Sequence, residues 1–266
     1  MREKKVGGFR LYLHYLSVIA KSAMQYKASF WMMAVGHFFV SFNVLAAVYF
    51  LFQRFSNVGG YVYSEVLLCF AVTLMEFSIA EIWARGFDTF PSMIRQGTFD
   101  RVLLRPRNEI LQVLGSKFEL VRIGRVLTAA VVFGYGVAQA GLRWTAGKVL
   151  ALLFMLAGGV ALFSALFLIY AALSFFTLEG LEFMNVFTNG AMEYGKYPFG
   201  VYGRKMLWIT TFVIPYALVQ HYPLQYLLDR EDNPVLIFLP LAAMWFLVPA
   251  FCLWRFGVRK YKSSGS

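Results

Sequence analysis

Long apolar runs, broken by shorter charged segments, are the main pattern along this chain. An apolar run of about 20 residues is long enough to cross the hydrocarbon core of a bilayer as a helix. The runs predicted to cross it are residues 28–52, 63–84, 118–140, 149–175, 207–220 and 235–254. The pattern therefore predicts an all-α polytopic membrane protein with six transmembrane helices.

A different periodicity precedes the first run. Within residues 9–26, polar side chains recur at spacings of four, three and four, and apolar side chains share another face. The polar set is Arg10, His14, Ser17 and Lys21, and the apolar set is Leu13, Leu16, Ala20 and Met24. A helix of this kind favours the surface of a membrane. We therefore expect residues 1–27 to contain an N-terminal amphipathic interfacial helix.

The composition supports a membrane protein and argues against a nucleic-acid-binding one. Hydrophobic residues make up 59% of the 266 residues and charged residues only 15%, whereas soluble domains are nearer half apolar. The net charge of +11 does not indicate nucleic-acid binding, because the chain has no soluble basic module with interleaved aromatic residues. Cys69 and Cys252 lie in apolar runs and are expected to be small core residues.

The positions of lysine and arginine predict the orientation in the membrane. With both termini in the cytoplasm, 21 of the 25 Lys and Arg residues lie on the cytoplasmic side. The four outside are Arg54, Arg143, Lys148 and Arg230. Basic residues concentrate on the cytoplasmic side of membrane proteins. The same assignment places two longer connections, residues 85–117 and 176–206, in the cytoplasm.

Acidic side chains inside the second run are costly in a bilayer and therefore informative. Glu65, Cys69, Thr73 and Glu76 lie on one side of the expected helix, since eleven residues are close to three turns. Glu81 lies on nearly the opposite side. Glu65, Thr73 and Glu76 are therefore candidates for a substrate pathway. The same polar line fits static pairing between helices, and the sequence leaves both alternatives open.

Motifs of hydrolytic or metal chemistry are absent from the sequence. There is no phosphate-binding G-x-x-x-x-G-K-[ST] loop, no H-E-x-x-H pair and no cysteine cluster. His14, His37 and His221 fall at the predicted inner surface, inside the first run and at an outer end, so they do not form one hydrolase site. We predict neither a catalytic residue nor a metal site in this chain.

The stretch GTFDRVLLRPRN, residues 97–108, sets charged residues and a proline between two apolar runs. Gly97 is suited to end one short helix, and Pro106 is suited to end the next. The charged residues between them then face water or a partner protein. On these grounds the stretch is either an ordinary cytoplasmic loop with snorkelling arginines or a compact docking element.

The same stretch resembles the G-x-x-D-x-x-L-L-x-P element of ABC type-2 permeases, in the six-span branch in which two related permeases share one ATPase. The stretches KYPFGVYG (196–203), FVIPYA (212–217) and HYPLQYLL (221–228) also fit that branch, so the resemblance covers nearly the whole chain. In the family this loop forms a coupling helix that docks on the ATPase subunit. The resemblance implies ATPase-coupling roles for Gly97, Asp100, Arg101, Leu103, Leu104, Arg105 and Pro106.

The resemblance further implies a function and a set of partners. The chain would be the non-catalytic permease subunit of an ATP-binding cassette exporter for an amphiphilic or lipid-like substrate. Two copies of a separate ATPase would hold ATP and Mg²⁺, a paralogous second permease would complete the complex, and this chain would bind membrane lipid but neither cofactor nor nucleic acid. The expected location is the bacterial cytoplasmic membrane. The alternative is an ATP-independent secondary transporter or channel, although no inverted internal repeat is evident.

The predicted organisation is a single transmembrane domain of residues 1–262. Residues 28–84 hold spans one and two, 85–117 the coupling loop, 118–175 spans three and four, and 207–256 spans five and six. Residues 176–206 are expected to form a second cytoplasmic segment that touches the ATPase. Residues 263–266, SSGS, resemble a linker left by cloning and are excluded.

Overall fold

The computed structural model describes residues 17–18, 21–22, 25–177 and 181–262, and its regular elements in these ranges are all helices. Most of the predicted interfacial helix within residues 1–27 lies outside the described residues. Five helical segments in the described ranges are long and apolar enough to cross a membrane. They are Lys27–Arg54, Tyr63–Arg95, Leu120–Ala140, Ala146–Leu173 and Leu239–Lys260. The predicted all-α, multi-pass class is therefore confirmed.

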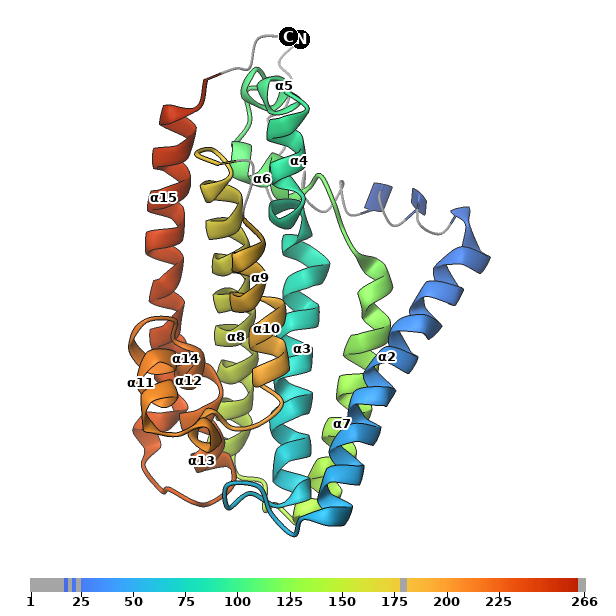
Figure 1. The fold of residues 1–266 in the computed structure, drawn as a ribbon, viewed down its shortest axis with the longest axis vertical. Helices are drawn as coiled ribbons and strands as arrows, with labels where there is room; N and C mark the ends of the chain where they lie inside the picture. The colour runs from blue at the N-terminus through green and yellow to red at the C-terminus, as the bar shows by residue number, and fades with distance from the viewer. Residues whose placement is uncertain (1–16, 19–20, 23–24, 178–180, 263–266) are drawn as a thin grey trace.

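The long segments form a bundle around α3 (Tyr63–Asp88), as Figure 1 shows. α7 (Ile123–Ala140) and α8 (Ala146–Leu173) pack on α3, and α15 (Leu247–Lys260) packs on α8. α2 (Lys27–Arg54) leans against α7 and leaves most of its surface exposed. Lipid tails surround apolar side chains as favourably as leucines do, so an exposed apolar helix is compatible with a membrane.

The bundle has two distinct ends. One end, here called the α4–α6 end, carries α4 (Phe90–Arg95), α5 (Phe99–Leu103) and α6 (Glu109–Leu114), together with the start of α2 and the end of α15. The opposite end, here called the loop end, carries the α2–α3 and α7–α8 connections, residues 55–62 and 141–145. The two ends of such a bundle face opposite sides of a membrane.

Packed aromatic rings fix the α4–α6 end. This aromatic cluster has neighbouring ring centroids 4.9 to 6.2 Å apart and comprises Phe87, Phe90, Phe99, Phe175, Trp254 and Tyr261. Ring pairs at these distances add stability beyond the burial of their surface. Helices as short as α4 and α5 are unstable alone, so their rings in this cluster hold them on the bundle.

The predicted fifth span, residues 207–220, is not a single transmembrane helix. The structure divides this region into α11 (Arg204–Phe212), α12 (Tyr216–Val219) and α13 (His221–Leu227), each too short to cross a bilayer. Pro215 is the physical reason, because proline lacks the N–H that a helix needs and clashes with the preceding turn. These helices gather towards the loop end in Figure 1.

A different segment passes along the bundle where the predicted span is missing. After residue 180 the chain forms η2 (Leu181–Phe183), α9 (Met184–Phe187), α10 (Asn189–Tyr194) and η3 (Phe199–Tyr202). α10 contacts α3, and Asn185 of α9 lines a pocket together with Tyr170 of α8. The chain later returns through η4 (Pro234–Ile237), α14 (Leu239–Ala243) and η5 (Met244–Phe246) into α15.

Three contacts trace the path of this broken segment. Its start lines a pocket with Glu81, in the half of α3 nearer the α4–α6 end. The Gly195 carbonyl accepts a 3.1 Å hydrogen bond from Thr73, in the middle of α3. Val201 lies against Gly59 at the loop end. Residues 181–203 thus pass from one end of the bundle to the other.

The predicted placement of residues 176–206 as one cytoplasmic segment does not fit this path. Gly195 lies beside the middle of α3 and Val201 at the loop end, opposite the coupling loop of residues 85–117. The segment escaped recognition because glycines and short breaks divide it into helices of at most six residues. Such a segment lacks the long apolar run by which membrane spans are recognised.

Candidate functional sites

The predicted coupling segment has a buried base and an exposed tip. Phe99 and Val102 of α5 are buried against the bundle, whereas Leu104 is 84% exposed and Leu103 is 43% exposed. Arg101, Arg105 and Pro106 of the predicted coupling set are exposed as well. The tip extends past the end of α3 in Figure 1. Apolar and basic side chains are therefore presented together on a short, anchored element.

Two residues of the predicted coupling set shape the segment itself. Gly97 has a φ of +65°, a left-handed conformation that is unfavourable for residues with a Cβ, and it turns α4 into α5. Asp100 accepts a hydrogen bond from the Tyr261 hydroxyl. Burial and this hydrogen bond raise the pKa of Tyr261 to about 12, so the hydroxyl remains a donor at neutral pH.

The predicted pathway residues Glu65 and Thr73 both have static partners. Glu65 accepts a 2.9 Å hydrogen bond from the Val62 N–H and pairs with Arg230 at 2.6 Å, at the loop end. Thr73 donates to the Gly195 carbonyl. These contacts favour the helix-pairing alternative for both residues.

Glu76 is different from the other two pathway candidates. Its side chain is buried, with 1% of the residue exposed. Among the described residues, no hydrogen-bond partner reaches its Oε1 atom. α8 comes so close at Gly159 that an added Cβ would overlap the Glu76 carboxyl carbon. A buried carboxyl group in a bilayer is costly, and static pairing does not account for it here.

Gln220 holds the chain break between α10 and η3, a role that the sequence analysis missed. Its amide nitrogen donates to the Gly195 carbonyl at 2.8 Å, and its oxygen accepts from the Phe199 N–H at 3.2 Å. The neighbouring His221 accepts from the Gly200 N–H at 3.3 Å. Backbone groups outside regular helices find no water in a bilayer, so they need such partners. The only sequence signal was a glutamine beside a histidine after an apolar run.

A second cluster that the sequence analysis did not assemble surrounds Glu81. The Glu81 carboxylate lies 2.9 Å from Arg125, 3.2 Å from Arg122 and 3.4 Å from Arg85. Arg122 belongs to η1 (Leu120–Arg122), Arg125 to α7, and Arg85 lies one turn beyond Glu81 on α3. The signal in the sequence was that Glu81 and the arginines carry opposite charges, lie in or next to consecutive apolar runs, and have similar predicted depths in the membrane.

Further charges extend the Glu81 cluster towards the α4–α6 end. Arg85 pairs with Asp88 at 2.9 Å, and Lys117 pairs with Glu119 at 3.2 Å. Burial opposes ionisation of Glu119, but the Lys117 hydrogen bond and the neighbouring cationic charges outweigh it, so the pKa of Glu119 lies below its ordinary value. With the three groups around Glu81, the cluster holds three carboxylates and four cations.

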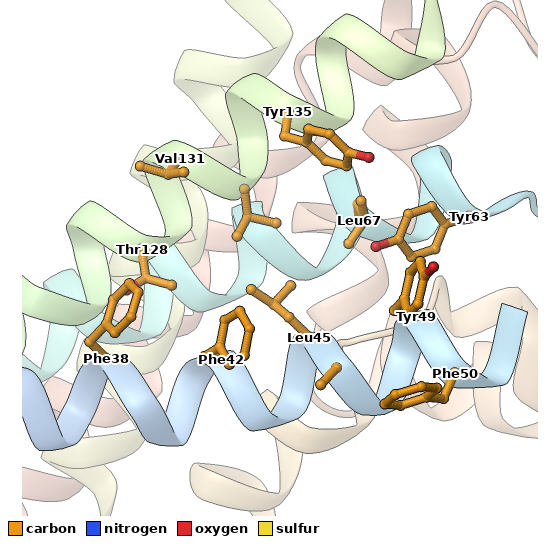
Figure 2. Close-up of a pocket in the computed structure, with 12 residues that line it drawn as sticks. Phe38, Phe42, Leu45, Tyr49, Phe50, Tyr63, Leu67, Thr128, Val131 and Tyr135 are labelled. Atoms are coloured by element: carbon orange, nitrogen blue, oxygen red, sulfur yellow. The ribbon is translucent and has the colours of Figure 1, made fainter. Parts of the chain in front are cut away.

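A large apolar hollow lies between α2, α3 and α7. Figure 2 shows its walls: Phe38, Phe42, Tyr49 and Phe50 come from α2, and Tyr63 and Tyr135 stand opposite. The cavity measures about 610 Å³. Its lining is almost wholly apolar or aromatic, with hydroxyl groups from the tyrosines and Thr128. Such a hollow suits an apolar chain, with a few polar groups to orient it.

Comparison with known proteins adds one finding to this geometry. Residues 30–265 match the family described as "ABC-2 family transporter protein". No curated protein and no solved structure shows significant similarity to the chain. The family match spans nearly every described element, from α2 to the end of α15. This chain is a multi-pass membrane protein that belongs to the ABC-2 transporter family.

Proposed function

We propose that this chain is the permease subunit of an ATP-driven exporter in the bacterial cytoplasmic membrane. ATP and Mg²⁺ bind two copies of a separate ATPase subunit, and a second, paralogous permease completes the complex. The observation that carries this proposal is the exposed tip of α5, with Leu103 and Leu104, on a base buried in the aromatic cluster. Membership of the ABC-2 family supports an ATPase partner for that tip.

The aromatic cluster provides a mechanical route from the tip into the bundle. Phe99 of α5 lies 5.5 Å from Phe175 and 6.2 Å from Trp254, measured between ring centroids. Phe175 follows α8, and Trp254 belongs to α15. Packed interiors shift between discrete arrangements rather than deforming gradually. A displacement of α5 by the ATPase therefore moves α8 and α15 together.

The corrected topology retains the proposed orientation. When Lys196, Arg204 and Lys205 are assigned to the outer side, the α4–α6 side keeps 14 of the 21 Lys and Arg residues in the described ranges and the other side has seven. The excess of basic residues remains on the side of the coupling tip, which supports a cytoplasmic location for the tip and both termini.

The substrate is proposed to be amphiphilic or lipid-like. The hollow in Figure 2 supports this class, because it combines aromatic walls with tyrosine hydroxyls on a face that α2 leaves open to lipid. Glu76 is retained as the proposed pathway residue, because its carboxyl group is buried without a hydrogen-bond partner for Oε1 among the described residues.

Site-directed crosslinking tests the docking surface. In a Cys252→Ser background, Leu104→Cys is modified with a photoactivated thiol reagent in native membranes, and crosslinked partners are identified by mass spectrometry. We expect an adduct with a nucleotide-binding ATPase subunit. Phe55→Cys is the matched control, since Phe55 is an exposed apolar residue at the loop end. If Leu104→Cys yields no ATPase adduct while the complex is intact, the proposed docking surface is wrong.

The alternative function, an ATP-independent secondary transporter or channel, makes a different prediction. Transport would then continue in vesicles without ATP and would follow an ion gradient. Transport by the proposed exporter requires ATP on the side of the coupling tip and stops when that ATP is removed.

A further inference from the structure

The Glu81 cluster borders a pocket whose lining side chains are all polar or charged. The pocket measures about 310 Å³ and is lined by Glu81, Arg85, Asp88, Arg122, Arg125, Tyr170, Asn185 and Asn189. These residues come from α3, η1, α7, α8, α9 and α10, so the fold assembles the pocket from distant parts of the chain. A hollow of this composition is unsuited to an apolar chain and suited to a hydrated or ionic group.

The charges of the pocket lining do not cancel. The lining contains two carboxylates, Glu81 and Asp88, and three guanidinium groups, so it has an excess of one positive charge. Adding the neighbouring pair of Lys117 and Glu119 leaves the excess of one positive charge unchanged. An excess cation beside a membrane is stabilised when an anion joins the cluster.

Two of the guanidinium groups retain unused donors. The Nε atoms of Arg85 and Arg122 are buried, and within the described residues neither has a hydrogen-bond partner. They lie 3.9 Å and 3.6 Å from the Glu119 carboxylate, within reach of its charge but beyond hydrogen-bonding distance. Arginine presents several N–H donors in a planar fork that matches phosphate oxygens.

The depth of the pocket matches the surface of a bilayer. Glu81 lies 18 residues after Tyr63, which begins α3 at the loop end, so the rise along the helix is roughly 27 Å. The hydrocarbon core is about 30 Å thick. Glu81 therefore lies near the boundary on the α4–α6 side, and Arg85 and Asp88 lie at the level of the head groups.

From this geometry we propose that the pocket binds an anionic phosphate group, supplied by a membrane phospholipid or by free phosphate. Arg85, Arg122 and Arg125 provide the charge, and Tyr170, Asn185 and Asn189 provide polar groups around the rim. This inference does not depend on the proposed ATPase or on the proposed substrate.

Lipid-dependent stability of the full chain tests this proposal. The protein is purified in a phosphate-free maltoside detergent, and its Tm and lipid retention are measured with and without added phosphatidylglycerol. A separate arm adds inorganic phosphate, against an equal ionic strength of chloride, to the sample without lipid. A rise in Tm with phosphatidylglycerol identifies a lipid phosphate, and an equal rise with inorganic phosphate alone identifies a free one.

Asn189→Asp places a carboxylate in the pocket and neutralises the excess charge without removing an ion pair. We expect the affinity for the effective anion to fall at least about ten-fold, since a unit charge at close range contributes more than 1.4 kcal/mol. Asn185→Asp tests the same point from the preceding turn. Asn57→Asp, at the exposed loop end, is the matched control and should behave as wild type.

Two outcomes would overturn the proposal. One is a wild-type Tm that responds to neither phosphatidylglycerol nor phosphate. The other is a rise in Tm that is as large in Asn189→Asp and Asn185→Asp as in Asn57→Asp. This comparison requires that all three variants elute as folded proteins and unfold cooperatively.

Discussion

The hydroxyl of Tyr261 donates a 2.9 Å hydrogen bond to the carboxylate of Asp100. Because Tyr261 directly follows α15 and Asp100 lies in α5, this bond ties the predicted coupling helix to the end of the last long helix. The same ring packs 5.2 Å from Phe99. The aspartate of the motif thus acts within the chain, and the neighbouring leucines remain exposed for a partner.

Removing the hydrogen bond between Tyr261 and Asp100 should weaken the attachment of α5 without removing a ring from the aromatic cluster. Tyr261→Phe keeps the ring and should lower the free energy of unfolding by about 1 to 3 kcal/mol, because the bond joins a hydroxyl to a charged acceptor. Thermal unfolding in detergent measures the change. Tyr26→Phe, on an exposed ring, should cost less than about 0.5 kcal/mol. Equal stability of the two variants would contradict the structural role of the bond.

Gly97→Ala should destabilise the coupling segment through its backbone. The φ of +65° at this position costs a residue with a Cβ about 1 kcal/mol or more. Gly134→Ala is the control, because Gly134 lies within α7 and an added Cβ would meet nothing within 4 Å. Alanine favours a helix, so this control should be neutral or slightly stabilising. Stability curves that coincide for the two variants would contradict the prediction.

The Gly159→Ala variant should be destabilised, because its added methyl group clashes with the Glu76 side chain. A second substitution, Glu76→Ala, should relieve this clash. Overpacking of this kind costs about 1 to 3 kcal/mol, and the added methyl group overlaps the Glu76 carboxyl group. The double variant should therefore be more stable than the sum of the single effects predicts, in a double-mutant cycle. Gly158→Ala is the control, since its Cβ would meet the Pro240 backbone oxygen at 2.5 Å. Glu76→Ala should leave that clash in place.

Glu81→Gln should cost more than the loss of any exposed ion pair. The substitution leaves Arg85, Arg122 and Arg125 close together without their shared counter-charge, and breaking a buried pair costs about 3 kcal/mol or more. Glu193→Gln removes the exposed partner of Lys196 and should cost less than about 1 kcal/mol. Chemical unfolding of both variants measures the difference. A loss of the same small size in both would show that the Glu81 cluster is not structural.

Accessibility labelling tests the corrected topology. In a Cys252→Ser background, Arg204→Cys and Arg143→Cys should both react with an impermeant thiol reagent added outside intact cells, whereas Arg105→Cys should not. The three native side chains are exposed. Protection of Arg204→Cys together with labelling of Arg143→Cys would restore the cytoplasmic placement of residues 176–206.

The sequence was sufficient for segments with long, uniform apolar runs. It located α2, α3, α7 and α8 closely, because each carries enough apolar length to cross a bilayer. It did not predict that residues 207–220 divide into short helices or that residues 181–203 run along the bundle, because residues 207–220 are more continuously apolar than residues 181–203. Length and hydropathy identify single long helices, whereas the path of residues 195–203 depends on partners such as Gln220 that lie elsewhere in the chain.

The candidate sites divide in the same way. Gly97 could be predicted from local turn chemistry, since a left-handed residue between two short helices favours glycine. The contact between Asp100 and Tyr261 could not be predicted, because 161 residues separate them. In the sequence, Glu81 is an acidic residue of the second apolar run and Arg122 and Arg125 lie about 40 residues later, and only the packing of α3 against η1 and α7 shows that they form one cluster.

The hydrogen bonds from Gln220 to the Gly195 carbonyl and from the Phe199 N–H to Gln220 have a consequence for biogenesis. Thr73, which is made earlier, also donates to the Gly195 carbonyl, but residue 220 leaves the ribosome after residues 195–199, so the Phe199 N–H is made before the side chain that accepts from it. An irregular backbone with unpaired polar groups is excluded from the lipid phase. We therefore expect residues 195–199 to be buried in the bilayer only once Gln220, at the junction of α12 and α13, has been synthesised.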